Sequence, residues 1–310
     1  MSTAPLVTVA MPCYNRAASL PMALASLAAQ SYPAWECVLV DDGSTDGSVE
    51  VAAGLNEPRI RIVRLPRHRG RGAARQAALE AARGDLFCLL DTDDWLYPDK
   101  LARQVEVMAL MPEVGVVGSA IAVVDARQEL IGVRGRGAPG GKVEWRPPVH
   151  GTLPPPLARV PLMMRMELAR QCRYDPRLRR AEDTDFVLQL LARANYAMLP
   201  GPTYAYRQER AAALWDNLSG YLYRMRVVWM HRQRSYGDAA RQLAVTGAKA
   251  AVYAGGSLLG AGEWLIRRRS LPATPAEIAE FTQARALVMA ERALRFGDVQ
   301  HPAQPIRAEA

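Results

Sequence analysis

Short apolar runs alternate with amphipathic segments along the N-terminal part of the chain. Runs rich in Val, Ile and Leu predict strands at 6–11, 36–40, 59–65, 86–90 and 114–119. The segments between them carry apolar residues on one helical face, and predict helices from Ser19 onward and at 48–55, 72–83 and 100–111. Strands that alternate with helices predict an α/β fold, in which a largely parallel sheet is flanked by helices on both faces.

The pattern changes after the last of these strands. Residues 134–162 are rich in Gly and Pro, which predicts an irregular excursion rather than a core element. A helix is predicted from Glu182 to Ala194, and from about Ala211 onward the chain is helical and basic. We therefore expect two regions: an α/β domain over 1–210, and a C-terminal helical extension over 211–310 that would contact a substrate, a membrane surface or a second copy.

The composition sets bounds on size and location. Half of the 310 residues are apolar, so the chain can bury the core of one large domain, with or without an appendage. No apolar run reaches the length of a membrane span, and the first residues lack the features of a signal peptide. The most hydrophobic stretch, 243–266, is interrupted by Lys249 and Glu263. We expect a cytoplasmic protein, with peripheral contact to the inner face of the membrane as an alternative.

The cysteines and the charges narrow the choice of partners. Four scattered cysteines have the spacing of neither a zinc site nor a disulfide framework. The net charge of +8 is carried almost entirely by arginine, and indicates either a solvated surface or attraction to phosphates or anionic lipid. Residues 59–75 are rich in arginine but lack interleaved aromatic side chains. We therefore expect no nucleic-acid partner, and expect some of these arginines to face phosphate.

Polar clusters follow three of the predicted strands. "PCYNR" (12–16) follows the first strand, "DDGSTDGS" (41–48) the second and "DTDDW" (91–95) the fourth. The carboxyl ends of parallel strands share one edge of a sheet, so these clusters are expected to converge on one crevice. Taken singly, each could be a turn or a helix cap. Crowded carboxylates raise one another's pKa unless a positive group neutralises them, which indicates a cation with oxygen ligands.

Three segments together resemble family 2 glycosyltransferases with the GT-A (Rossmann-like) fold: "VTVAMPCYNRAASLPMALASLAAQSYPAWECVLVDDGSTDGS", "GAARQAALEAARGDLFCLLDTDDWLYPDKL" and "RRAEDTDFVLQLL". The resemblance runs from about Val7 to Arg207. It implies a nucleoside-diphosphate-sugar donor, most often a UDP-sugar, with Mg²⁺ or Mn²⁺ as cofactor and inversion at the anomeric carbon. The Q-x-x-R-W element of processive synthases is absent, which favours a single addition, and the family's habits suggest a role in cell-surface glycan or polysaccharide synthesis.

The resemblance implies a donor site at the strand-end clusters. Tyr14 would stack on the nucleobase, and Asp42 would accept a hydrogen bond from it. Asp93 would bind the metal ion together with the diphosphate, while Asp91 would contact the ribose or the metal shell. Asp94 is expected to cap the following turn. The other donor-site residues implied by the resemblance are Pro12, Asn15, Asp41, Arg75 and Thr92.

The resemblance also implies a catalytic base. "AEDTDF" (181–186) matches the family's E-D element, and Asp183 would take the proton from the acceptor hydroxyl. The alternative is an acid placed at a helix N-terminus, where the macrodipole favours negative charge. Glu182, His150, Tyr206 and Arg207 are weaker candidates for contacts with the acceptor or with a loop that closes over the donor.

Three other functions share part of this pattern. A phosphatase of the haloacid dehalogenase type is excluded because Trp95 stands where its D-x-D-x-[TV] motif needs Thr or Val. A sugar nucleotidyltransferase is excluded because no G-x-G-T-R loop follows the first strand. A non-catalytic GT-A-like sugar-nucleotide-binding or scaffold protein remains open, and would be favoured if Asp93 or Asp183 faced away from the crevice. The expected partners are the donor, a glycan or lipid-linked acceptor, and a second copy in a homodimer.

Overall fold

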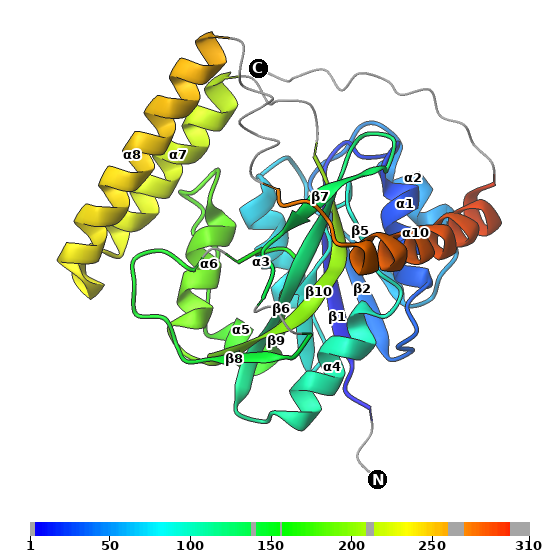
Figure 1. Cartoon of the computed structure of the whole chain (residues 1–310). Helices are drawn as coiled ribbons and strands as arrows, with labels where there is room; N and C mark the ends of the chain where they lie inside the picture. The colour runs from blue at the N-terminus through cyan, green and yellow to red at the C-terminus, as the bar shows by residue number, and fades with distance from the viewer. Residues whose placement is uncertain (1–3, 138–140, 156, 209–213, 260–269, 298–310) are drawn as a thin grey trace.

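A central sheet with helices on both faces forms the body of the molecule (Figure 1). The computed structural model describes residues 4–137, 141–155, 157–208, 214–259 and 270–297. Among these residues the sheet follows the order β3-β2-β1-β4-β9-β6-β10-β5, with β7 beside β6 and β8 beside β10. The predicted α/β class is therefore confirmed.

The first four strands form a parallel half-sheet in the order β3-β2-β1-β4. All of them were predicted from their apolar runs, as were the helices that connect them. In chain order the elements are β1 (Val7–Cys13), α1 (Leu20–Ala28), β2 (Trp35–Asp41), α2 (Ser48–Gly54), β3 (Ile60–Arg64), α3 (Arg71–Ala81) and β4 (Leu86–Leu89).

The second half of the sheet is mixed, which corrects the expectation of a largely parallel sheet. Strands β6 (Val114–Val124) and β10 (Asn195–Arg207) are parallel to each other. Between β4 and β6 lies the short β9 (Met163–Arg165), which is antiparallel to both neighbours. Three further antiparallel strands are β5 (Trp95–Leu96), β7 (Leu130–Arg134) and β8 (Glu144–Arg146).

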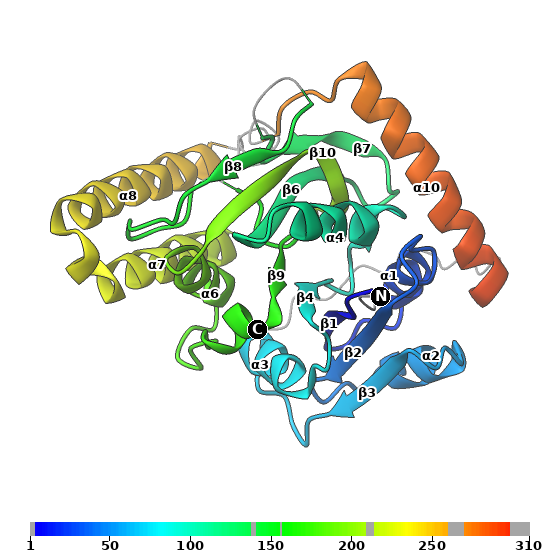
Figure 2. The ribbon, with the colours of Figure 1, turned by 90° about the horizontal axis from the view of Figure 1, so that it is seen from below.

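The remaining helices of the described residues are α4 (Lys100–Leu110), α5 (Met166–Arg170), α6 (Glu182–Leu191), α7 (Leu214–Met230), α8 (Tyr236–Leu258) and α10 (Pro275–Phe296), with a short 3₁₀ turn at Arg232–Arg234. Figure 2 shows α10 beside α1 and α4, while α7 and α8 form a hairpin on the opposite side of the body, beside α6. None of these helices, within the described residues, combines the length and apolar character needed to cross a bilayer.

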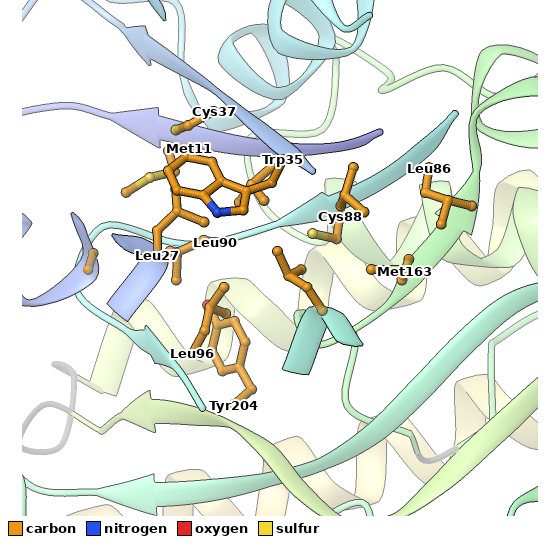
Figure 3. Packing of buried hydrophobic residues seen from close by; sticks show 14 of the residues in the cluster. Met11, Leu27, Trp35, Cys37, Leu86, Cys88, Leu90, Leu96, Met163 and Tyr204 are labelled. Atoms are coloured by element: carbon orange, nitrogen blue, oxygen red, sulfur yellow. The ribbon is translucent and has the colours of Figure 1, made fainter. Parts of the chain in front are cut away.

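Apolar side chains fill both faces of the sheet. On one face, residues of β1, β2 and β4 pack against α1 and α4, and Figure 3 shows Met11, Trp35 and Leu90 in this layer. On the other face, α3, α5 and α6 bury a second apolar layer. Cys37 and Cys88 are fully buried, and the other two cysteines are also buried and free. Each fully buried aliphatic side chain contributes about 1.5–3 kcal/mol, so this core holds the strand ends rigidly in place.

The described part of the C-terminal region packs on the α/β body at two separate places. Phe281 of α10 lies against the stacked rings of Trp95 and Tyr97. The α7–α8 hairpin instead packs on α6 through a small cluster that includes Leu188 and Val227. The basic "RRR" at 267–269 lies outside the described residues.

Asp238 ties α8 to the loop at Thr152. Its Oδ2 accepts hydrogen bonds from the Thr152 backbone N–H at 2.8 Å and from Thr152 Oγ1 at 2.7 Å. Although burial raises the pKa of Asp238, the bonds from Thr152, Arg241 and Gln242 lower it to about 2. The ionised form is thus the one that the fold stabilises.

Replacing Asp238 by asparagine is expected to lower the free energy of unfolding by about 2 kcal/mol at pH 7. The folded pKa lies below the unfolded value, so this stabilisation is present above about pH 4 and is lost as the pH falls toward 2. Urea unfolding at pH 7 and at pH 3 measures it: the difference between wild type and variant should shrink at pH 3. An unchanged difference would contradict the linkage.

Candidate active site

The predicted convergence of three polar clusters produces a cleft. The space in it, including the part open to solvent, is about 570 Å³. Cys13 pairs with Asp41 in the register of β1 and β2, so the segments that follow these strands emerge side by side. The lining residues are Pro12, Cys13, Tyr14, Arg16, Asp42, His68, Arg71, Ala74, Asp91, Thr92 and Asp93.

An aromatic pair and a carboxylate form one end of the cleft. The ring of Tyr14 stacks on that of His68, with centroids 3.9 Å apart. His68 Nδ1 lies 2.9 Å from Asp42 Oδ2. The same carboxylate accepts hydrogen bonds from the backbone N–H groups of Arg69 at 2.8 Å and Gly70 at 2.7 Å. This end therefore combines a flat aromatic surface, which suits a planar ring, with a nearly buried carboxylate whose two oxygens already accept backbone hydrogen bonds.

Glycine at position 43 allows the two loops at this end to meet. Gly43 has φ of +83°, and a Cβ there would come within 3.0 Å of the His68 backbone nitrogen. Asn15, also with positive φ, accepts a hydrogen bond from the Thr45 N–H, and Asp41 accepts one from the Ser44 N–H. Asn15 and Asp41, which the resemblance placed at the donor, are absent from the cleft wall and instead shape the loop that carries Asp42.

Three residues of the D-x-D segment form the other end. Asp91, Thr92 and Asp93 all line the cleft. Arg16 faces Asp93, with Nη2 and Oδ2 3.9 Å apart. The two aspartates are partly exposed, at 17% and 28% of their side chains, so both can reach a ligand.

Arg75 links the D-x-D segment to helix α6. Its Nη2 donates to Asp91 Oδ1 at 2.8 Å, and its Nη1 donates to Glu182 Oε1 at 2.9 Å. The side chain is only 2% exposed and does not line the cleft, although the resemblance assigned it to the donor. Arg75 therefore positions and neutralises Asp91 from behind. Glu182, a candidate for acceptor or lid contacts, is equally buried.

Asp94 joins the D-x-D segment to the end of β10. Its Oδ2 accepts a hydrogen bond from Tyr204 Oη at 2.8 Å, and its Oδ1 accepts one from the Arg207 N–H at 2.8 Å. The expectation that Asp94 caps the following turn is wrong, because both oxygens are directed at β10. Burial, with Asp93 and Asp91 nearby, holds the pKa of Asp94 well above its usual range.

Tyr206 and Arg207 lie at the same place, at the end of β10. Burial, followed by the field of Asp94, raises the pKa of the Tyr206 hydroxyl to about 12. Arg207 donates its backbone N–H to Asp94, as above. Both candidate lid residues thus lie next to the D-x-D segment in the folded chain.

Asp183 lies in the first turn of α6, beside an arginine of the loop before β9. Arg159 Nε donates to Asp183 Oδ2 at 2.9 Å, and the Thr184 N–H donates to Oδ1 at 2.6 Å. Burial acts to raise the pKa of Asp183, but Arg159 and Arg75 outweigh it and hold the pKa below its usual range. Asp183 is therefore ionised. It is not among the residues that line the cleft, whereas Asp93 is, so one of the two conditions named for a non-catalytic protein is met. Ala181, just before α6, has φ of +59°, the kind of strained backbone that often occurs at functional sites.

His150 and Asp185 do not lie with Asp183 and Arg159. The Val149 N–H donates to the Leu191 carbonyl, at the far end of α6 from Asp183, and His150 is exposed beside it. Asp185 is buried, and its Oδ1 lies 2.6 Å from Nε2 of His231. Asp185 therefore attaches the end of α7 to α6.

The carboxylates of the cleft suit a metal ion that is completed by a substrate. No group of three His, Cys, Asp or Glu side chains within the described residues could hold a metal by itself. Asp91 and Asp93 are two carboxylates of one cleft wall, and Arg75 already neutralises Asp91. Mg²⁺ is commonly bound by one or two carboxylates together with substrate phosphates. The residues therefore fit Mg²⁺ or Mn²⁺ only when phosphate oxygens supply the remaining ligands.

Five lining residues were not singled out from the sequence, and three of them have basic or imidazole side chains: Arg16, His68 and Arg71. The arginine-rich segment gave a partial signal for Arg71, whose Nε also lies 3.6 Å from Glu182 Oε1. Arg59, Arg61 and Arg64 of the same segment pair elsewhere, with Glu57, Glu36 and Asp41. The sequence does not tell which of these arginines reaches the cleft. That depends on the direction in which each side chain projects from its strand or helix.

The fold is that of glycosyltransferases of the GT-A type. Residues 8–150 match the model of glycosyl transferase family 2. The putative glycosyltransferase EpsE of Bacillus subtilis (strain 168) is 32% identical over 201 residues, which are 61% of this chain and 68% of EpsE. The chain belongs to glycosyl transferase family 2.

Other relatives match a shorter stretch of the chain. The putative teichuronic acid biosynthesis glycosyltransferase TuaG of Bacillus subtilis (strain 168) is 40% identical over 106 residues, 34% of this chain and 42% of TuaG. Several curated relatives are thus matched over less than half of their length. The fold is shared more widely: S. aureus TarS 1-349, solved in complex with UDP-GlcNAc, superposes with a TM-score of 0.61 at 20% identity, covering 94% of this chain and 90% of that one.

Proposed function

We propose that the protein transfers a sugar from a nucleoside-diphosphate-sugar, of the UDP type, to an acceptor hydroxyl in the synthesis of a cell-surface glycan. The single observation that carries this is the cleft, which combines an aromatic and acceptor end at Tyr14 and Asp42 with an acidic end at Asp91 and Asp93. Family membership, the UDP-GlcNAc bound to the structural neighbour TarS, and the teichuronic acid role in the name of TuaG support it.

The donor is proposed to lie along the cleft. The nucleobase stacks at Tyr14 and accepts or donates hydrogen bonds near Asp42, and the diphosphate reaches the D-x-D segment. Arg16 and Arg71 line the same cleft and offset the negative charge of the diphosphate. When bound at Asp91 and Asp93, Mg²⁺ or Mn²⁺ would stabilise the charge that builds on the leaving diphosphate.

Asp183 is proposed to act as the base of a single inverting displacement. Its ionised carboxylate accepts the proton of the acceptor hydroxyl while that oxygen bonds to the anomeric carbon. The bond from the anomeric carbon to the diphosphate oxygen breaks at the same time, and its electron pair leaves with the nucleoside diphosphate. Attack from the face opposite the leaving group inverts the anomeric configuration. The pairing of Asp183 with Arg159 keeps the carboxylate ionised before the acceptor binds.

Donor binding is measurable without knowing the acceptor. UDP with Mn²⁺ is expected to raise the melting temperature by about 5 °C at a hundred times its Kd, and GDP, dTDP and CMP by much less. Tyr14→Ala should remove most of this rise because the stacking surface is lost. Tyr32→Ala is the matched control, since that tyrosine bonds the Pro5 carbonyl and does not line the cleft. A rise that is the same in both variants, or absent with all four nucleotides, would contradict the donor site.

A further inference from the structure

A second group of arginines surrounds Asp183, outside the donor cleft. Arg159 comes from the loop before β9, and Arg224 comes from α7, which runs beside α6 (Figure 1). Arg224 lies within electrostatic range of both Arg159 and Asp183. Neither arginine lines the cleft that the donor is proposed to occupy. Two guanidinium groups outside the cleft thus act on the Asp183 carboxylate.

This arrangement leaves positive charge unneutralised. Among the residues that the structure describes, Arg159 uses only its Nε in a hydrogen bond, to Asp183, which leaves its two Nη groups available. Within the described part of the chain, Arg224 makes no hydrogen bond or ion pair, and it is only partly exposed. Burial lowers the pKa of Arg224, and repulsion from Arg159 lowers it further. Asp183 and Glu182 both act on Arg159, whereas Asp183 is the carboxylate that acts on Arg224. An anionic ligand would relieve the repulsion between the two arginines.

We propose that Arg159 and Arg224 form an anion subsite, which binds a phosphate group of the acceptor next to the hydroxyl that Asp183 deprotonates. This rests on the proposed function and names the acceptor class: a phosphorylated acceptor rather than a neutral glycan. The guanidinium groups of arginine suit phosphate because each presents paired N–H donors in a plane. Helix α7 of the C-terminal region thereby becomes part of the active site.

The location of the subsite separates it from the donor diphosphate. The diphosphate is met by Arg16, Arg71 and the D-x-D segment in the cleft. Arg159 instead contacts Asp183 Oδ2, on the first turn of α6. A phosphate bound there would lie beside the attacking hydroxyl. The same chemistry is offered by a lipid-linked diphosphate and by a phosphodiester polymer.

Phosphate binding tests the subsite directly. The full chain is first saturated with UDP and Mn²⁺, which fills the donor site, and methyl phosphate is then titrated by calorimetry. Arg224→Gln and Arg159→Gln are each expected to raise the Kd of methyl phosphate by about 10-fold to 100-fold, because one charge-assisted contact is lost. Arg224→Lys should restore part of the loss. Arg226→Gln is the matched control, since Arg226 is exposed on the same helix two residues away.

The outcomes separate this proposal from the proposed function. If UDP binds and methyl phosphate does not, or binds equally well to wild type and to both glutamine variants, the subsite is refuted while the donor site stands. If UDP fails to bind but the binding of methyl phosphate still depends on Arg224, the proposed function fails and the anion subsite stands. If Arg226→Gln weakened the binding of methyl phosphate to the same degree, the subsite would be refuted. The loss of affinity would then be explained by the general loss of surface charge.

Transfer assays then identify the source of the phosphate. A short-chain polyprenyl-diphosphate sugar, a poly(glycerol phosphate) and a neutral oligosaccharide are compared as acceptors. The anionic acceptor that is used should lose about 10-fold or more in kcat/KM in Arg224→Gln, with the loss mainly in KM. Efficient use of the neutral oligosaccharide, unaffected by Arg224→Gln, would overturn the proposal.

Discussion

Asp183→Asn is expected to lower kcat by about 10²–10⁴-fold, the range that a positioned general base contributes. The amide keeps the shape of the carboxylate and can still accept from the Thr184 N–H, but it cannot take the proton of the acceptor. Donor binding should change little, because Asp183 does not line the donor cleft. Steady-state kinetics of sugar transfer, together with calorimetric titration of UDP, measure the two effects separately.

Asp185→Asn is the control for the Asp183 variant. Both aspartates lie in the first turn of α6 and experience the same helix dipole. Asp185 is bonded to His231 and to Gln189, away from the acceptor side, so its loss should affect stability more than kcat. If Asp183→Asn transferred sugar as fast as wild type, the base assignment would fail. The non-catalytic sugar-nucleotide-binding function would then be favoured.

The pH dependence of kcat gives a second readout of Asp183. Because its pKa is held below the usual range, activity that depends on its ionised form should persist below pH 4 until other groups titrate or the fold is lost. Arg159→Gln removes the largest of the stabilising charges, so it should raise the pKa of Asp183 and move the acid limb of kcat to higher pH. The other groups that face Asp183 are Arg71, Arg75, Arg224, Glu182 and Tyr174.

Asp93→Ala is expected to lower kcat/KM by about a thousandfold, because loss of the metal removes several kcal/mol of stabilisation from the leaving diphosphate. Removing divalent metal with EDTA should reduce the wild-type enzyme to the same level. EDTA should have little further effect on the variant, since both changes remove the same interaction. Kinetics over a series of Mn²⁺ concentrations would show the loss as a metal requirement that the variant no longer satisfies.

Asp99→Ala is the control for the metal site. Asp99 lies six positions further along, 49% exposed, and faces Arg103 at 3.4 Å rather than the cleft. Its removal should leave the Mn²⁺ dependence unchanged. A wild-type enzyme that is fully active in EDTA would refute the metal role of Asp93, whatever the effect of the alanine variant.

The parallel half of the sheet could be predicted because each of its elements is specified locally. The strands β1, β2, β3 and β4 are short apolar runs, and the helices between them carry one apolar face each. The mixed half was not predictable in this way. Strand β10 contains Pro200, Gly201 and Pro202, which are typical of loops, yet β6 pairs with it through irregular register. Its strand form comes from tertiary pairing and not from local preference.

In the site, too, some features follow from local sequence and others from tertiary packing. The sequence by itself determined the strand-end position of Tyr14, Asp42 and the D-x-D segment, because chain order and sheet geometry alone bring the ends of β1, β2 and β4 together. Only the tertiary structure decided which side chains fill the cleft and which support it. Arg75 is buried behind Asp91, Asp94 is bonded to β10, and Arg159 is paired with Asp183. These contacts join residues far apart in the chain, and their partners depend on packing directions that no local pattern encodes.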